Sequence, residues 1–348
     1  MLKGEAPMLK KAQYWITELR APFLTATIGS IILGTIIAWT RNDLFNLPFF
    51  VLAFLGGVCA HLGTNVANDY YDHKSGNDEV NREFVRPFSG GSRTIQQGLL
   101  TPREVLGGAL LFFAIASSIG VYLSLVNGPI VLALALVGLV SGFFYTAPPF
   151  NWASKGAGEA LVGVNFGALM TLGAYYVQTR TLSLEPLVAA IPLSLLIAAV
   201  LYINEFPDYV ADKAVGKRTL VVRLGRDKAA YGYAVIVFSA YVSIVLSALF
   251  GVMPAYTLLA LMPLPLAVEA VRHVLRFHSE SLKLVPANAV TITLHLMTSL
   301  LVSVGYLMHR FVFASLGYIV VLVLAGICAL LTLNSYFKIR KAERLVAN

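Results

Sequence analysis

Apolar residues occur along this chain in ten runs of roughly 20 residues, a length that crosses the hydrocarbon core of a bilayer as a helix. The runs are continuous, whereas the strands of a membrane barrel are shorter and alternate between apolar and polar positions. The pattern therefore predicts an all-α, polytopic membrane bundle of nine to ten transmembrane helices. The runs cover approximately residues 20–40, 48–70, 103–126, 129–147, 158–179, 185–207, 229–251, 254–275, 286–309 and 312–337.

Composition supports a membrane protein over a soluble one. Of 348 residues, 57% are hydrophobic and only 13% are charged, whereas soluble domains are about 25% charged. We treat residues 1–348 as a single membrane domain and expect 312–337 to form an additional C-terminal transmembrane helix.

The positions of Lys and Arg predict the orientation, because short cytoplasmic loops of membrane proteins are enriched in both residues. With the N-terminus in the cytoplasm, all but three of the 26 cations fall on the cytoplasmic side, and only Arg41, Arg180 and Arg310 lie outside. We therefore predict a multi-pass protein of the plasma membrane. The net charge of +8 reflects this topology, and because the basic residues lie in short loops between spans, we expect no nucleic-acid partner.

The second apolar run ends in a strongly polar stretch, NVANDYYDHKSGNDEVNREFVRPFSGGSR, which covers residues 65–93. Read as a helix, it places Asn68, Asp69 and Asp72 on one face, and Asp78 follows after a short flexible segment. Carboxylates that close together repel each other unless a cation lies between them. The stretch is thus a candidate metal site, although a solvated helix end is the alternative for one such stretch alone.

A second stretch, NEFPDYVADKAVGKR, closes the sixth apolar run and spaces Asn204, Asp208 and Asp212 at four-residue steps. We expect Pro207 to break the helix just before Asp208. The repeated arrangement indicates a weak internal duplication, and duplicated membrane halves commonly place their binding site at the interface between them. The two acidic stretches should therefore face one central cavity, open to the cytoplasmic side and to lipid.

The ligand types in this cavity indicate a magnesium-bound diphosphate. Oxygen ligands without His or Cys suit Mg²⁺, which is usually shared between one or two carboxylates and substrate phosphates. Neighbouring basic residues can bind the phosphate oxygens. The apolar bundle can bind a hydrophobic tail on the same substrate, so we predict a polyprenyl diphosphate. The candidate metal ligands are Asp69, Asp72, Asp78, Asp208 and Asp212, and the candidate phosphate contacts are Lys74, Arg93, Lys217 and Arg218.

Other segments near the predicted cavity allow two interpretations. The loop at residues 73–101 is long enough to be a cap over the site or a disordered segment, and we favour the cap. Tyr145 and Trp152 lie at the cytoplasmic end of the fourth run, where aromatic residues are also typical of an interfacial belt. We interpret the intramembrane Glu269 and His295 as structural groups.

The two aspartate-rich stretches resemble the two motifs of the UbiA superfamily of intramembrane prenyltransferases. The resemblance covers residues 15–310 and rests on Asn68-Asp69-Tyr70-Tyr71-Asp72 with Asp78, and on Asp208 to Asp212 followed by Lys213, Gly216, Lys217, Arg218 and Thr219. The segment Tyr145 to Gln178 resembles the menaquinone branch, the 1,4-dihydroxy-2-naphthoate prenyltransferases. The first motif departs from the usual N-D-x-x-D-x-x-x-D because Gly76 occupies the position of the last Asp, and the next acid is Asp78.

The resemblance implies nine spans, Mg²⁺ as cofactor, and a catalytic set of Asp69, Asp72, Asp208, Asp212 and Tyr145. It implies that Asn68 and Asn204 assist at the diphosphate, that the diphosphate ionises to an allylic carbocation stabilised by the face of Tyr145, and that the ring of the acceptor attacks this cation. The aromatic acceptor would enter near Lys155 and Glu159. Loss of carbon dioxide and a proton would then give demethylmenaquinone.

Two alternatives remain open from the sequence. The first is a prenyltransferase with another acceptor, namely 4-hydroxybenzoate, homogentisate, a chlorophyllide, haem or a glycerol phosphate, because the aspartates indicate only the diphosphate. The second alternative is an ion-coupled transporter. Transporter carboxylates tend to lie near the bilayer midplane, whereas these lie at helix ends beside cations.

Overall fold

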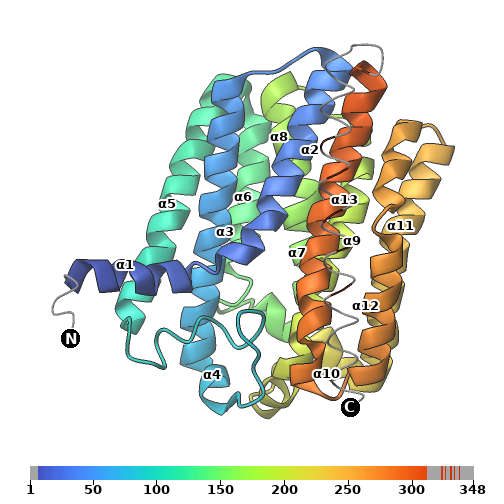
Figure 1. Ribbon diagram of the computed structural model, residues 1–348. Helices are drawn as coiled ribbons and strands as arrows, with labels where there is room; N and C mark the ends of the chain where they lie inside the picture. Colours follow the sequence, from blue (N-terminus) through green and yellow to red (C-terminus); the bar gives the residue numbers. More distant parts are fainter. Residues whose placement is uncertain are drawn as a thin grey trace, which may run out of the picture.

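A computed structural model describes residues 7–311 and the isolated positions 323, 326, 330, 333 and 337. Every element within residues 7–311 is helical, and the long helices run side by side as a bundle (Figure 1). The elements are α1 (Pro7–Glu18), η1 (Ala21–Leu24), α2 (Thr25–Asn42), α3 (Leu47–Ser75), α4 (Asn77–Val80), α5 (Pro102–Asn127), α6 (Pro129–Phe143), η2 (Trp152–Lys155), α7 (Gly158–Gly163), η3 (Val164–Leu169), α8 (Met170–Thr179), α9 (Leu184–Ala214), α10 (Leu220–Leu224), α11 (Arg226–Leu249), η4 (Ala255–Leu261), α12 (Leu264–Phe277), η5 (Ser281–Leu284) and α13 (Val285–Phe311).

The described residues contain eight helical segments that are long and apolar enough to cross a membrane. The shorter apolar helix α6 corresponds to the fourth predicted run. The predicted all-α membrane bundle is thus confirmed. The tenth run, residues 312–337, lies outside the described residues except at the five isolated positions, which are helical.

Local sequence signals set several helix ends. Helix α5 starts at a capping box, in which Thr101 and Glu104 each bind the other's backbone N–H group, with Pro102 in the first turn. Helix α3 starts after Asn46, whose side chain accepts a hydrogen bond from the Phe49 N–H. It ends at Gly76, whose φ of 79° favours glycine and turns the chain directly into α4.

Helix α1 lies beside the lower end of α5, at a steep angle to the long helices, and extends outward from the bundle (Figure 1). It was not predicted, because it is short and carries Lys10 and Lys11 on an exposed face. The indole of Trp15 packs against Gly108 of α5, at a contact that a side chain at position 108 would block. Such a helix is typical of the membrane interface.

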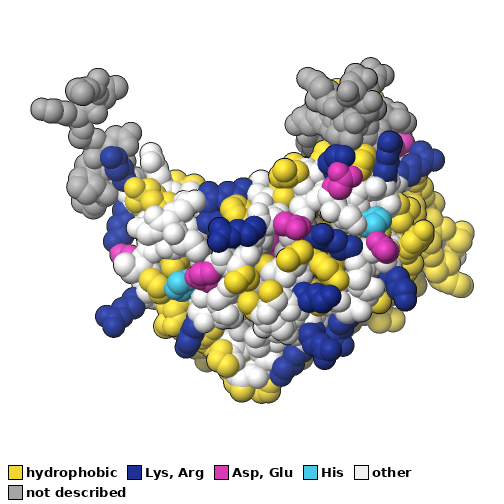
Figure 2. Space-filling model, turned by 90° about the horizontal axis from the view of Figure 1, so that it is seen from below, with side chains coloured by type: hydrophobic (Ala, Val, Ile, Leu, Met, Phe, Trp, Pro, Cys, Tyr) yellow, Lys and Arg dark blue, Asp and Glu magenta, His cyan; other side chains and the backbone are white. Residues whose placement is uncertain are grey.

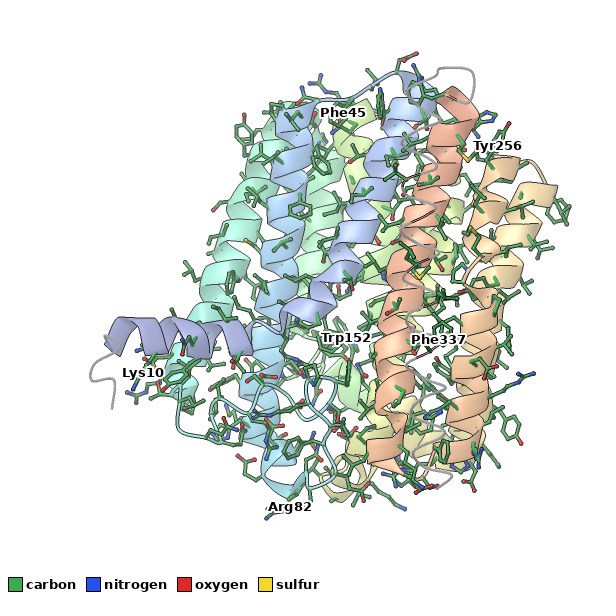
Figure 3. The ribbon with its side chains drawn as sticks, in the orientation of Figure 1. Lys10, Phe45, Arg82, Trp152, Tyr256 and Phe337 are labelled. Atoms are coloured by element: carbon green, nitrogen blue, oxygen red, sulfur yellow. The ribbon has the colours of Figure 1, made fainter. Side chains whose placement is uncertain are left out.

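The acidic stretches and most cations lie at the same end of the bundle as α1, α4 and α10. Figure 3 places Lys10 and Arg82 toward this end, and Phe45 and Tyr256 at the opposite end. Viewed from below, Lys and Arg side chains are spread over the face at this end (Figure 2). The three arginines predicted to lie outside all have partners: Arg41 binds Glu185 at 2.7 Å, Arg310 binds Asp43, and Arg180 donates to Asn127 at 3.3 Å. Which end faces the cytoplasm stays a prediction.

The expected break at Pro207 is wrong, because α9 continues through both Pro192 and Pro207 to Ala214. A proline removes one backbone hydrogen bond of the helix, but membrane helices tolerate this where neighbouring groups satisfy the backbone. The carbonyl that lacks its donor because of Pro207 is that of Ile203. Arg226 binds the adjacent part of the helix, donating from both Nε and Nη2 to the carbonyl oxygen of Phe206, at 3.2 and 3.0 Å. Phe206 is also fully buried, so tertiary packing holds the helix straight past the proline.

Two glycines of α2 allow close helix contacts. A β-carbon at Gly29 would collide with Ser299 of α13, and one at Gly34 would collide with the carbonyl oxygen of Thr171 in α8. Small residues of this kind let helix backbones approach each other in membranes.

We expect Gly34→Ala to destabilise the bundle by about 1–3 kcal/mol, because the new methyl group meets a backbone carbonyl that cannot move aside. The midpoint of thermal unfolding in detergent measures this. Gly107→Ala in α5 is the matched control, because a β-carbon there meets nothing within 4 Å. An unchanged midpoint in the Gly34 variant would contradict the packing argument.

Candidate active site

A cavity of about 1000 Å³ lies between the two acidic stretches. Helix α3 contributes one stripe to its wall, at three- and four-residue steps that place the side chains on one helix face. Along the helix the stripe begins with His61, continues with the uncharged polar residues Thr64, Asn65 and Asn68, and ends with the carboxylate of Asp72. The predicted convergence of Asn68 and Asp72 is present, and the Asn68 amide donates to Asp72 Oδ2 at 3.0 Å.

Helix α9 contributes a second stripe with the same gradient. Its apolar part is followed by an amide and a carboxyl group, and then by two aspartates, all facing the cavity. The residues are Ile197, Val200, Leu201, Asn204, Glu205, Asp208 and Asp212. The two halves of the chain therefore present matched faces to one cavity, as the internal duplication predicted.

Lys217 bridges the two halves. Its ammonium lies 3.3 Å from Asp72 Oδ2 on α3 and 3.6 Å from Asp212 Oδ1 on α9. Burial alone would lower the pKa of Lys217, but the carboxylates of Asp212 and Asp72 outweigh burial and hold this pKa well above its usual range. Lys217 therefore stays charged in the cavity wall.

The segment after α3 fixes the aspartates of α9. Asn77 donates to Asp212 Oδ1 at 3.1 Å, and Asn81 donates to Asp208 Oδ1 at 2.6 Å. The backbone N–H of Gly90 reaches Asp208 Oδ2 at 3.3 Å. The loop predicted as a cap thus forms part of the cavity wall.

Asp78 lines the cavity and is bound by the same loop. Gln96 donates to Asp78 Oδ2 at 2.9 Å, and Arg93 lies 3.9 Å from Asp78 Oδ1 while donating to the Asp78 carbonyl oxygen at 2.5 Å. Burial, reinforced by the carboxylates of Asp72 and Asp69, raises the pKa of Asp78 to about 8. The acid that takes the place of the missing motif aspartate therefore does reach the cavity.

Asp69 does not share the cavity face, which corrects the predicted grouping. One residue further along a helix turns the side chain by about 100°, so Asp69 points away from the stripe of Asn68 and Asp72. It accepts a hydrogen bond from the Ser92 N–H at 2.8 Å and lies 3.4 Å from Arg20 Nη1. Ser92 also donates to Glu18 at 2.5 Å. Asp69 thus anchors the loop to the end of α1.

The predicted basic residues divide into two groups. Lys217 lines the cavity, and Arg93 approaches it through Asp78. Lys74, Lys155 and Arg218 are exposed, and none of the three lines the cavity. One cation that the sequence analysis missed, Arg20, does line it, with a left-handed backbone (φ 50°) that is unusual for this residue type.

Tyr145 lies where this cavity meets a second, apolar one of about 1040 Å³. The two cavities share five lining residues, which are His61, Thr64, Tyr145, Val162 and Phe166. The apolar cavity follows α3 from Thr64 back to Leu52, about 18 Å at 1.5 Å per residue. Trp152 stacks on Phe150 at 5.2 Å and lines neither cavity, so the belt interpretation remains for this residue (Figure 3).

The donor atoms fit a small divalent cation. Two buried amide oxygens, Asn77 Oδ1 and Asn81 Oδ1, have no hydrogen-bond partner, and both lie on side chains that bind the α9 aspartates. Among the described residues, no three acidic, imidazole or thiol groups converge on one point. Mg²⁺ usually takes one or two protein carboxylates and completes its octahedron with waters and substrate phosphates.

A membrane bundle with an acidic cavity mouth that continues into a large apolar chamber is the architecture of an intramembrane prenyltransferase. The UbiA prenyltransferase family model matches residues 27–285, and the chain belongs to this family. It is 29% identical over 308 residues to 1,4-dihydroxy-2-naphthoate octaprenyltransferase of Escherichia coli, which covers 87% of this chain and 97% of that protein. It is 26% identical over 313 residues to the protein of the same name from Bacillus subtilis, with coverages of 89% and 98%.

A further relative is 2-carboxy-1,4-naphthoquinone phytyltransferase of Synechocystis, 25% identical over 301 residues, with coverages of 86% and 94%. These relatives place the chain in the menaquinone branch, as the sequence resemblance predicted. Among solved structures, the fold is similar to digeranylgeranylglyceryl phosphate synthase (TM-score 0.56, 17% identity, 85% of this chain and 98% of that chain) and to a UbiA homologue from Aeropyrum pernix K1 (0.53, 14%, 84% and 98%).

We expect the apparent affinity for Mg²⁺ to rise by up to about tenfold per pH unit between pH 6.5 and 8, and to level off above. Below pH 8, Asp78 holds a proton that Mg²⁺ must displace. Half-saturating Mg²⁺ concentrations, measured from prenyl transfer at each pH, test this. Asp78→Asn should flatten the profile, and an affinity that falls as the pH rises would contradict it.

Proposed function

We propose that this chain transfers a polyprenyl group from a polyprenyl diphosphate to 1,4-dihydroxy-2-naphthoate. The observation that carries the proposal is a pair of adjoining cavities, in which a carboxylate-lined cavity and an apolar one share Tyr145 and four other lining residues. A diphosphate fits the first part and a prenyl tail fits the second. The bond that breaks would then lie at the boundary between the two, beside Tyr145.

The residues at the mouth would hold the diphosphate. Asp72, Asp78, Asp208 and Asp212 are the carboxylates available to Mg²⁺, which when bound neutralises charge on the leaving group. Lys217 and Arg20 supply protein cations to the phosphate oxygens. Asn68 and Asn204 line the wall between these groups and the apolar chamber, where they contact the substrate.

Tyr145 would stabilise the allylic carbocation left behind. An aromatic face attracts a desolvated cation by about 2 kcal/mol or more. Burial, with the Glu205 carboxylate nearby, raises the pKa of Tyr145 above its usual value, so the phenol stays neutral. The apolar side chains around it exclude water, which would otherwise capture the cation.

The names of the relatives support a naphthoate acceptor over the alternative acceptors. Attack of the ring carbon that bears the carboxylate forms the new C–C bond, and loss of that carboxylate as carbon dioxide restores the aromatic ring and yields the quinol, the two-electron-reduced form of demethylmenaquinone. The cavity mouth lies at the end of the bundle where Lys and Arg gather, so we also propose that the reaction occurs on the cytoplasmic side.

We expect Asp72→Asn and Asp208→Asn each to lower kcat by roughly 100-fold or more, because each removes charge that balances the cation at the leaving group. The assay follows prenylated naphthoate by mass, with geranylgeranyl diphosphate and Mg²⁺. Asp227→Asn is the matched control, since its side chain is 85% exposed and far from the cavity lining. Near-normal rates in either cavity variant would refute the placement of the diphosphate.

We expect Gly173→Phe to shorten the prenyl donor that the enzyme accepts. Gly173 lines the apolar chamber, and a β-carbon there meets nothing within 4 Å, so the new ring fills the space meant for the tail. Turnover with dimethylallyl or geranyl diphosphate should persist, while turnover with longer donors falls. Gly107→Phe, which faces outward, serves as control. An unchanged preference would show that the tail lies elsewhere.

A further inference from the structure

Glu205 lies at the boundary between the polar and the apolar part of the cavity. Along the α9 stripe, Leu201 is the last apolar residue and Asp208 is the first aspartate. Glu205 lies about one helical turn after Leu201 and just under one turn before Asp208. It is therefore level with the place where the diphosphate joins the prenyl tail, which is where the acceptor ring must meet the donor.

Glu205 has no counter-ion and no hydrogen-bond donor for its Oε2 atom among the described residues, although only 6% of the residue is exposed. Its side-chain partner is another carboxyl group, Glu159, and because two carboxyl groups in hydrogen-bond contact share one proton, the pair itself has one donor for four oxygen atoms. Buried acceptors without donors are rare in proteins, because each costs roughly 1–3 kcal/mol. A buried carboxyl group that faces a cavity in this state indicates a ligand with a donor group.

Glu159 contacts Glu205 on the side that faces away from the cavity. The Leu220 N–H donates to Glu159 Oε1 at 2.7 Å, whereas Glu159 Oε2 has no donor. Glu159 is 3% exposed and does not line the cavity, so only Glu205 can contact a ligand. The backbone bond fixes Glu159, and Glu159 in turn limits the positions that the Glu205 side chain can adopt.

The surroundings of Glu205 suit a flat aromatic molecule. Tyr145, Val162 and Phe166 line the adjoining wall where the two cavities meet. Phosphate oxygens have no hydrogen to donate and would be repelled by a carboxyl group, and a prenyl tail has no polar atom. A ring hydroxyl supplies the missing donor.

We propose that Glu205 accepts a hydrogen bond from a hydroxyl group of the aromatic acceptor, and that Glu159 positions it for this contact. This proposal rests on the proposed prenyl transfer to a hydroxylated ring and deepens it. It assigns acceptor recognition to a residue next to Asn204, between the diphosphate-binding groups and the tail chamber, and not to Lys155, which is exposed.

The experiment compares wild type, Glu205→Gln and the exposed control Glu280→Gln in detergent with Mg²⁺. Three parameters are measured: the KM for 1,4-dihydroxy-2-naphthoate, the KM for geranylgeranyl diphosphate, and the half-saturating Mg²⁺ concentration. We expect Glu205→Gln to raise the acceptor KM by about tenfold, as for the loss of one hydrogen bond to a charged group, and to change the other two less than twofold. An unchanged acceptor KM, or an equal rise in the Mg²⁺ requirement, would overturn the proposal.

Acceptor analogues that lack one ring hydroxyl give a second, independent readout. With the analogue that lacks the bound hydroxyl, wild type and Glu205→Gln should show the same weak KM, because the interaction is already absent. A full tenfold difference that persists with every analogue would overturn the contact. If Glu205→Gln does not fold, Glu159→Gln replaces it, with a smaller rise in the acceptor KM expected and an unchanged KM contradicting the proposal.

The same design separates this proposal from the proposed function. Failure of the wild type to prenylate the naphthoate at all would refute the acceptor. The three parameters would then be measured with 4-hydroxybenzoate, which also carries a ring hydroxyl, and there again only a selective rise in the acceptor KM supports Glu205.

Discussion

The ammonium of Lys217 lies between carboxylates of α3 and α9, and the cavity is organised around this contact. Five carboxyl groups line the cavity, and among the described residues only two cations, Lys217 and Arg20, line it with them. Like charges gathered in a region of low dielectric are costly unless they are neutralised. Two cations balance only part of this charge, so the cavity has capacity for further positive charge, which a substrate-bound metal would bring.

The matched stripes of α3 and α9 explain how one cavity handles two kinds of chemistry. Helix α9 changes from apolar residues to aspartates along this cavity, and α3 does so over the two cavities, from Leu52 to Asp72. Tyr145 lies where the two cavities meet, and Glu205 lies where the α9 stripe changes from apolar to acidic. A polyprenyl diphosphate bound here would be orientated by this polarity, with the tail toward the interior of the bundle and the diphosphate toward its end.

The sequence predicted the bundle, the cation-rich end and the convergence of Asn68, Asp72, Asp208 and Asp212, because hydrophobic length and four-residue spacing translate directly into geometry. It wrongly placed Asp69 on the same helix face as Asn68 and Asp72, because the side chains of adjacent helix residues point about 100° apart. It also failed at Pro207, where the burial of Phe206 and its contact with Arg226 of another helix hold α9 in place. Such long-range compensation leaves no local trace in the sequence.

Loop residues were the hardest to assign. A lysine or arginine in a loop contributes charge, but its direction depends on the fold, and Lys74 and Arg218 turn toward solvent while Lys217 turns inward. Single residues such as Arg20 and Glu205 belong to no repeated pattern, so neither stood out. Only the cavity and the unsatisfied atoms around it draw attention to them.

The hydrogen bond that Ser92 donates to Glu18 links the N-terminal helix to the segment that forms the cavity wall. Helix α1 lies beside α5, its last residue binds the segment that walls the cavity, and Asp69 binds the same segment from α3. A fusion partner or truncation at the beginning of the chain would therefore act on turnover as well as on insertion. A force that lipids exert on α1 would be transmitted to the cavity wall through the same contacts.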